Sequence, residues 1–285
     1  MHDTQTNNAL RLGQLLLDSQ KITPADAEKI LRLQKAENLR FGDAAIQLGL
    51  VTENDIRRAL AHQFEYPYLA PGEGGFSSEI IAAYDPFSAE VEQIRSLRSQ
   101  LILRWFTLGH KTLALVTDLS DNSASHLTAN LAVVFSQMGE NTLLIDANLR
   151  ESRQHKLFNL GNRAGLSDIL AGRADMSATV RLNQLRGLSL LTAGTTPPNP
   201  VELLSQTGFA NLLEQYSQQY DVILVDSPPG MFSEASLVCS RVGGTLLTAS
   251  KDVSRISDLQ KMILTLGENG ASIIGTVLTD FPDRR

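Results

Sequence analysis

The chain has 285 residues, of which 42% are hydrophobic and 20% charged, a composition that supports a buried core and excludes a largely disordered protein. Its 25 Lys and Arg against 31 Asp and Glu give a net charge of -6, which argues against a generic basic surface for a nucleic acid polymer. The single cysteine, Cys239, excludes an internal disulfide, and its apolar neighbours predict a buried thiol.

No spacing of histidines or cysteines matches a set of metal ligands, so we expect no metal site. The N-terminus is polar, and no apolar run approaches the roughly 18–20 residues of a membrane helix. We therefore expect a cytoplasmic protein that associates with a membrane only through a partner.

The chain divides into two parts. Residues 10–64 have apolar positions at a helical period, and the Pro- and Gly-rich stretch that follows is typical of a linker. Beyond it, short apolar runs alternate with amphipathic stretches, which predicts an α/β fold with a mainly parallel sheet and ligands at the carboxyl ends of its strands. We expect a small all-helical domain at 1–66, a linker at 67–78 and an α/β domain at 79–285.

The α/β part begins with a predicted helix at about 88–107, and a second helix starts near Ser125. The predicted strands are Thr112–Thr117, Thr142–Ala147, Leu188–Thr192, Asp221–Asp226, Gly244–Ala249 and Ser272–Leu278.

The helical part is a tandem repeat. Arg11–Gln34 and Arg40–Gln63 have the same length, and residues 35–39 separate them. The matched positions that predict helix caps are Thr23 with Thr52 and Asp26 with Asp55. Each copy also begins with an Arg two residues before a Gly, namely Arg11 with Gly13 and Arg40 with Gly42. Helix capping does not require this pair of residues. Glycine allows close approach of a ligand, and arginine offers a fork for phosphate and a flat face for a purine.

This repeat resembles the MshE N-terminal domain family, whose members bind cyclic di-GMP. The resemblance rests on Arg-Leu-Gly at 11–13, Arg-Phe-Gly at 40–42, the closing Gln of each copy and the five-residue spacer. It implies a cyclic di-GMP site formed by Arg11, Leu12, Gly13, Leu16, Leu17, Gln34, Arg40, Phe41, Gly42, Asp43, Ala45, Ile46 and Gln63. A purely structural helical module is the alternative.

The α/β part has the setting of a phosphate-binding loop without its residues. Such a loop needs glycines, a Lys for the phosphates and a Ser or Thr for Mg²⁺, between a strand and a helix. Residues 118–125 contain no Gly and no Lys, and only Ser125 fits. Ala124 stands where the lysine is expected, and Asp118 and Asp121 add negative charge. We therefore expect the loop to repel ATP.

The flanking motifs resemble those of bacterial tyrosine kinases that accompany polysaccharide chain-length determinants. They lie at 127–132, 143–150, 194–204 and 220–229. With the helical repeat, the whole chain resembles the EpsG-type kinases of exopolysaccharide export. The resemblance implies a P-loop ATPase fold and assigns Asp146 and Asp226 to Mg²⁺ and catalysis.

Three departures from that kinase pattern predict a pseudokinase. The loop is altered, Asn148 replaces a second acid, and no tyrosine follows Tyr220, whereas the family carries a C-terminal tyrosine cluster. Asp146, Asp226 and Ser125 are then degenerate remnants of a catalytic site. We expect no required cofactor, and we do not expect ATP and Mg²⁺ to bind.

A charged motif, Glu92, Arg95 and Arg98, lies in the helix before the first strand. In the resembling kinases this motif contacts a neighbouring subunit, which implies a homo-oligomer. An ordinary solvated face is the alternative.

The sequence therefore favours a cyclic di-GMP receptor that regulates exopolysaccharide biosynthesis or export through an inactive kinase-like domain. Its expected partner is a membrane polysaccharide chain-length determinant or another export protein. The first alternative is a weakly active ATPase or autokinase of the same system. The second is a scaffold without a ligand.

Overall fold

The computed structural model describes residues 12–53, 55–57, 59, 67–70, 72–118 and 122–280. The chain forms two compact units, unit 1 at Met1–Pro67 and unit 2 at Tyr68–Arg285. Each unit has its own hydrophobic core. Among the described residues, no helix has both the length and the hydrophobicity required to cross a bilayer.

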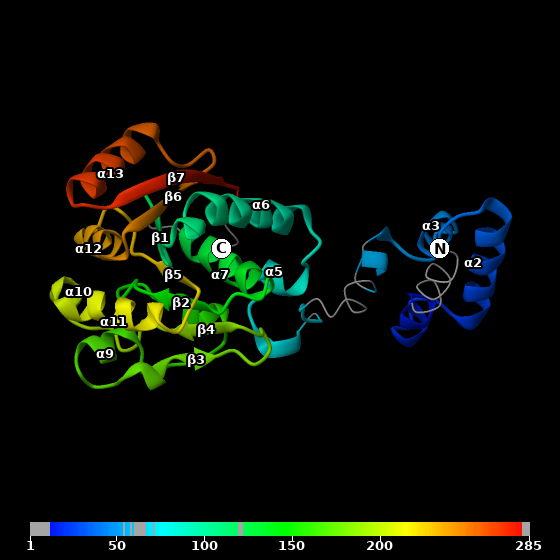
Figure 1. Ribbon diagram of the computed structural model, residues 1–285, viewed down its shortest axis with the longest axis horizontal. Helices are drawn as coiled ribbons and strands as arrows, with labels where there is room; N and C mark the ends of the chain where they lie inside the picture. Colours follow the sequence, from blue (N-terminus) through cyan, green and yellow to red (C-terminus); the bar gives the residue numbers. More distant parts are fainter. Residues whose placement is uncertain are drawn as a thin grey trace. The chain divides into compact units, whose positions relative to one another are not determined.

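The described secondary structure of unit 1 consists of helices joined by short turns. A helix covers 12–18, α2 spans Pro24–Glu37 and α3 spans Phe41–Gln47 (Figure 1). Leu16 and Ile30 are fully buried between these helices, so apolar side chains at helical spacing form the small core, as the periodicity predicts.

The predicted caps of the repeat are present in both copies. The Thr23 hydroxyl accepts from the Asp26 amide at 3.2 Å, and Thr52 accepts from the Asp55 amide at the same distance. Lys21 of the first copy also pairs with Asp55 of the second at 2.9 Å. Burial raises the pKa of Asp55, but the bonds from Thr52 and Lys21 outweigh it and lower that pKa to about 2.

Unit 2 alternates strands with helices. Its strands are β1 (Thr112–Thr117), β2 (Thr142–Asp146), β3 (Val180–Arg181), β4 (Leu188–Leu191), β5 (Val222–Asp226), β6 (Gly244–Ser250) and β7 (Ser272–Thr279). Its helices are α5 (Ile81–Tyr84), α6 (Ala89–Arg104), α7 (Ser123–Ser136), α8 (Gln154–Leu157), α9 (Leu166–Leu170), α10 (Pro200–Ser205), α11 (Thr207–Ser217), α12 (Ser233–Val242) and α13 (Ile256–Glu268). Short 3₁₀ turns are η1 (Glu73–Gly75), η2 (Phe106–Leu108) and η3 (Met176–Ala178).

The strands form one seven-stranded sheet in the order β3-β4-β2-β5-β1-β6-β7. All pairs are parallel except β3 with β4, which is antiparallel. The predicted α/β fold with a mainly parallel sheet is thus confirmed, and all six predicted strands are present. The seventh strand, β3, has only two residues and no apolar run to reveal it.

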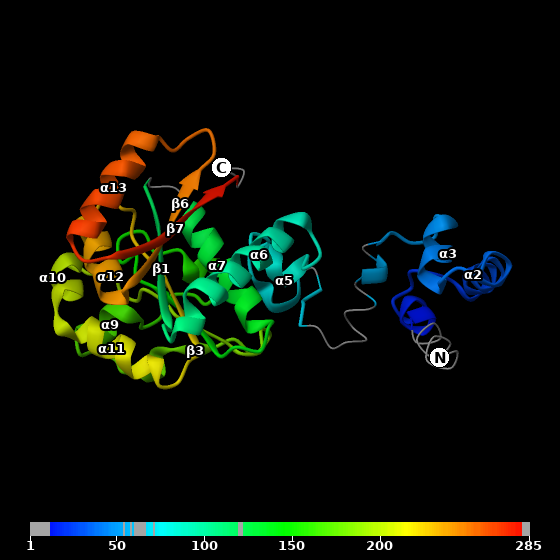
Figure 2. The same cartoon turned by 45° about the horizontal axis from the view of Figure 1, so that its top comes forward.

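Helices cover both faces of this sheet (Figures 1 and 2). On β1, Leu113 and Leu115 point into the core beneath α5, α6 and α7, whereas Ala114 and Val116 point toward α11, α12 and α13. Burial on both faces explains why the strands read as continuous apolar runs. Cys239 of α12 is buried, as predicted, and burial raises the pKa of its thiol to about 11.

The predicted linker differs from the structure. Leu69 and Phe76 are buried in the core of unit 2, and the Leu69 amide donates to the Ala83 carbonyl at 2.8 Å. The compact unit therefore begins at Tyr68 rather than at 79. The Pro and Gly residues of this segment form turns that let its apolar side chains pack into the core of unit 2. Composition alone does not distinguish such a segment from a linker.

Candidate functional site

Two aspartates meet at the carboxyl edge of the sheet. Asp146 ends β2 and Asp226 ends β5, and the two residues are paired in register on neighbouring strands. Both side chains are fully buried. Burial raises the pKa of Asp226 to about 6, and burial together with the charge of Asp226 holds the pKa of Asp146 well above its usual range.

Backbone amides occupy both oxygens of Asp146. Oδ2 accepts from the amides of Arg153 and Gln154 at 3.1 and 3.0 Å, and Oδ1 accepts from Asn148 at 3.2 Å. The first two bonds hold the turn that begins α8. Asp146 therefore has a structural function in this arrangement.

A glutamine side chain holds Asp226. The Gln154 amide nitrogen donates to Asp226 Oδ2 at 2.7 Å and to the Ser125 carbonyl at 3.0 Å. The Ser125 hydroxyl lies close enough to lower the pKa of Asp226. Asp226 Oδ1 and Gln154 Oε1 are buried and have no hydrogen-bond partner within the described chain.

The altered loop is only partly described, and Asp121 lies outside the described residues. Asp118 accepts from the Ser254 hydroxyl at 2.7 Å, which ties the loop to the segment after β6. Ala124 and Ser125 are buried in the first turn of α7. The methyl group of Ala124 offers no charge where a phosphate-binding loop needs a cation.

These residues do not fit Mg²⁺-bound ATP well. Mg²⁺ prefers oxygen ligands in octahedral geometry, and both oxygens of Asp146 and one of Asp226 already accept hydrogen bonds. Of the oxygens of Asp146, Asp226 and Ser125, all of them described, Asp226 Oδ1 and the Ser125 hydroxyl are left for a metal. In the described part of the chain no group of three or more His, Cys, Asp or Glu side chains could hold a metal ion.

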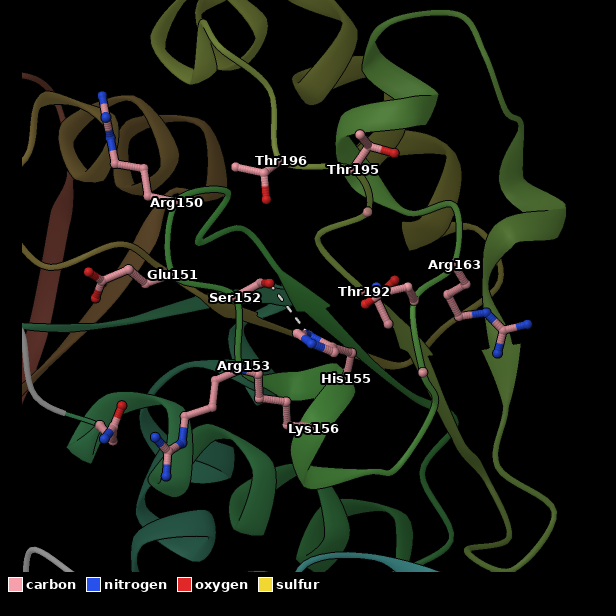
Figure 3. Close-up of a pocket in the computed structure, with 14 residues that line it drawn as sticks. Arg150, Glu151, Ser152, Arg153, His155, Lys156, Arg163, Thr192, Thr195 and Thr196 are labelled. Carbon is pink, nitrogen blue, oxygen red and sulfur yellow. Dashed lines mark hydrogen bonds between the residues drawn. The ribbon is translucent and has the colours of Figure 1, made fainter. Parts of the chain in front are cut away.

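A basic pocket of about 900 Å³ is lined by the segment that follows β2 (Figure 3). The segment after β2 supplies Arg150, Arg153, His155 and Lys156, and the loop after β4 supplies Thr195 and Thr196. Four lining side chains are basic, Arg150, Arg153, Lys156 and Arg163, against one acid, Glu151. The net charge of the whole chain is -6, so this concentration of positive charge is local.

Sequence reasoning missed Gln154 and this pocket. A signal was present, because the run from Arg150 to Lys156 is basic and directly follows a predicted strand end. No comparable signal marks Gln154, whose contact with Asp226 spans 72 residues of sequence.

The residues assigned to cyclic di-GMP divide into buried and exposed groups. Leu12, Leu16, Phe41 and Ala45 are buried in the core of unit 1, and Leu17 and Ile46 pack against it. Arg40 and Asp43 are exposed, and Gln34 is half-buried. Arg11 and Gln63 lie outside the described residues.

Packing explains both glycines of the repeat. A methyl group on Gly13 would lie 3.2 Å from the ring of Phe41, and one on Gly42 would lie 3.3 Å from the Ile56 side chain. Each glycine permits close contact inside the unit. A role in ligand binding therefore depends on the arginines and glutamines.

The charged motif of α6 makes contacts within the chain. Arg95 Nη1 donates to Glu92 Oε2 at 3.0 Å, and Arg98 Nη1 donates to the Val134 carbonyl of α7 at 2.6 Å. Arg98 therefore attaches α6 to α7. A role of Glu92, Arg95 and Arg98 between subunits stays a prediction.

The fold and the strand-end aspartates define an α/β protein of the P-loop ATPase type with an altered nucleotide loop. The kinase domain of Escherichia coli tyrosine kinase ETK has the same fold, with a TM-score of 0.69 and 30% identity over 72% of this chain and 81% of that domain. No protein-family model matches the chain.

Two curated relatives agree with this fold. The putative tyrosine-protein kinase CapB of Staphylococcus aureus is 31% identical over 198 residues, which are 69% of this chain and 87% of CapB. Tyrosine-protein kinase wzc of Salmonella typhi is 33% identical over 202 residues, 70% of this chain, but the match spans only 28% of that relative. The chain belongs to the bacterial tyrosine-kinase family.

Proposed function

We propose that the protein is a non-phosphorylating member of this family that regulates exopolysaccharide synthesis or export. The observation that carries the proposal is the loss of the loop cation at Ala124, next to an aspartate that Gln154 holds. Phosphoryl transfer depends on cationic stabilisation of the phosphates and on Mg²⁺. The loop supplies no cation, and most carboxylate oxygens nearby accept hydrogen bonds.

Calorimetry of the full chain with ATP and Mg²⁺ tests the loss of kinase activity. We expect no saturable heat and no transfer of labelled phosphate to the protein. Asp226→Ala is the control, because turnover that survives this change comes from a contaminant. Hydrolysis that Asp226→Ala abolishes contradicts the proposal.

The proposal assigns cyclic di-GMP to unit 1 as the regulating ligand. Arg40 precedes the first turn of α3, is exposed, and has no carboxylate partner in the described part of unit 1. The buried residues beside it fix the start of α3. An arginine held in this way at a helix start suits a phosphate, and the duplicated unit suits a two-fold ligand.

Titration calorimetry with cyclic di-GMP tests this part. We expect saturable binding that Arg40→Ala abolishes and that Arg32→Ala, a change of an exposed arginine on α2, preserves. Both variants should melt at the temperature of the unmodified protein. Absence of binding at tens of micromolar, about -6 kcal/mol, favours the scaffold alternative.

The expected partner is a membrane polysaccharide chain-length determinant. Similarity to the putative tyrosine-protein kinase CapB, 87% of which the match covers, supports this partner. Sedimentation with membranes that contain the determinant, compared with membranes that lack it, tests the association. Equal sedimentation in both samples contradicts it.

A weakly active ATPase is the second candidate. The unpartnered Asp226 Oδ1 beside Ser125 favours it, because a buried oxygen of this kind can accept a cation or a proton. This function predicts Mg²⁺-dependent ATP hydrolysis that Ser125→Ala reduces.

A further inference from the structure

We propose that the basic pocket of unit 2, which Asn122 of the altered nucleotide loop also lines, binds a phosphorylated sugar. The site is formed by His155, Lys156, Arg163 and Thr192 (Figure 3). It lies where the segments after β2 and β4 meet.

Two of the four cations that line the pocket form no ion pair with a described carboxylate. Arg150 Nε bonds to Glu234 at 2.6 Å, and Arg153 Nη2 bonds to Glu79 at 3.0 Å. Lys156 and Arg163 have no such ion pair with any described residue. Exposed cations are common, so these two residues alone do not define a site.

The buried hydroxyl of Thr192 is the second observation. Thr192 directly follows β4, lines the pocket and is 2% exposed, yet its Oγ1 has no hydrogen-bond partner among the described residues. A buried hydroxyl without a partner is unfavourable, and an oxygen of a ligand would satisfy it.

The wall that carries Thr192 is held rigidly. Asp168 Oδ2 accepts from the amides of Gly165 and Thr195 at 3.1 and 3.0 Å, and the Ser167 hydroxyl donates to the Thr195 carbonyl at 2.6 Å. Gly194 adopts a φ of +84°, a conformation that glycine tolerates readily. Binding there would not need to order the loop first.

The lining indicates the class of ligand. All the described residues around the pocket are polar, charged or glycine, with no aliphatic side chain and no Phe, Tyr or Trp. These residues include no Phe, Tyr or Trp ring on which a nucleobase could stack, whereas hydroxyl-rich sugars suit Ser, Thr and Asn, and a phosphate suits Arg and Lys. A volume of about 900 Å³ accommodates a sugar phosphate.

His155 provides a spectroscopic signal for binding. Burial and the neighbouring Lys156 lower the pKa of His155, and its Nδ1 lies 3.4 Å from the Ser152 hydroxyl. An anion bound near the imidazole should raise this pKa toward its ordinary value. The shift reports proximity to the ligand and does not depend on any activity.

The experiment is calorimetry of the full chain with glucose 1-phosphate, glucose and inorganic phosphate as separate probes. We expect glucose 1-phosphate to bind at least tenfold more tightly than either fragment. Arg163→Ala and Thr192→Val should each weaken it at least tenfold, while Arg186→Ala, an exposed arginine outside the pocket, should not. Thr192→Val should fold at least as stably as the unmodified chain.

Four outcomes overturn the proposal. The first two are the absence of saturable binding and an equal affinity for inorganic phosphate alone. The third is an equal effect of Arg163→Ala and Arg186→Ala on binding. The fourth is loss of binding in Ser125→Ala, which would assign the ligand to the nucleotide loop. Arg40→Ala should bind glucose 1-phosphate normally. Failure here is therefore separable from failure of cyclic di-GMP binding in unit 1.

Discussion

The side-chain amide of Gln154 donates to Asp226 Oδ2 at 2.7 Å, and both residues are completely buried. The bond joins the start of α8 to the end of β5. An oxygen that a catalytic aspartate would offer to a metal is thereby held by a protein donor. Burial, which this bond only partly offsets, makes the folded state sensitive to the charge of Asp226.

Asp226→Asn should flatten the dependence of stability on pH. The pKa of Asp226 is raised from 3.8 to about 6, so between these values the folded state keeps a proton that the unfolded state has lost. The stabilisation of the folded state by this proton is complete below pH 3.8 and is lost as the pH rises through about 6. Urea unfolding from pH 4 to 8 should show this loss, and Asp226→Asn should be more stable at pH 8. The same curve in both proteins contradicts the assignment, and Asp258→Asn on α13, where the side chain is 45% exposed, is the control.

Gln154→Leu should destabilise unit 2 by about 2 kcal/mol or more, because it leaves the buried Asp226 Oδ2 without a donor and removes a second donor from the Ser125 carbonyl. Urea unfolding at pH 8 measures the effect. Gln215→Leu on the exposed face of α11 is the control and should change stability little. In combination with Asp226→Asn the two effects should not add, since they share one hydrogen bond.

Arg98→Ala should destabilise the folded monomer by about 1–3 kcal/mol, since a charged donor to the Val134 carbonyl is lost. Glu92→Ala should change it by about 0.5 kcal/mol or less, because the Glu92 side chain is 70% exposed. Unfolding and light scattering on the same samples separate two roles. A fall in molecular mass without a fall in monomer stability would place Arg98 between subunits instead.

Gly165→Ala should be severely destabilising, because its methyl group would collide with the Thr192 carbonyl and the Gly194 amide. Gly267→Ala on α13 should instead stabilise by up to about 1 kcal/mol, since nothing lies near that position and alanine favours a helix. Thermal melts of the two variants compare them directly. Equal melting temperatures would show that the loop after β4 moves freely.

The strands of unit 2 were predictable because each buried parallel strand is a short apolar run. The resemblance to the kinases assigned Asp146 and Asp226 to one function, and the structure pairs them on neighbouring strands. The order of the strands was not predictable from alternation alone, since the neighbours of β1 are the distant β5 and β6. The turn at 67–78 was mistaken for a linker because Pro and Gly mask the burial of Leu69 and Phe76.

The pocket was less accessible to sequence reasoning than the aspartates. Its residues come from separate loops, and single Thr and Arg residues carry no periodic signal. In unit 1 the duplication identified the glycines, but their packing against Phe41 and Ile56 follows only from coordinates.

The strand order has a consequence for how the chain folds during synthesis. β1, an interior strand of the sheet, pairs only with β5 and β6, whose first residues follow more than a hundred positions later. Until Val222–Asp226 has left the ribosome, β1 has no strand beside it, and its apolar residues depend on α7 for cover. Pairing of strands that are so far apart in the sequence is slow and leaves aggregation-prone folding intermediates exposed. Unit 1, whose helices contact their neighbours in sequence, has no such delay, so fragments that end before β5 should aggregate through unit 2 alone.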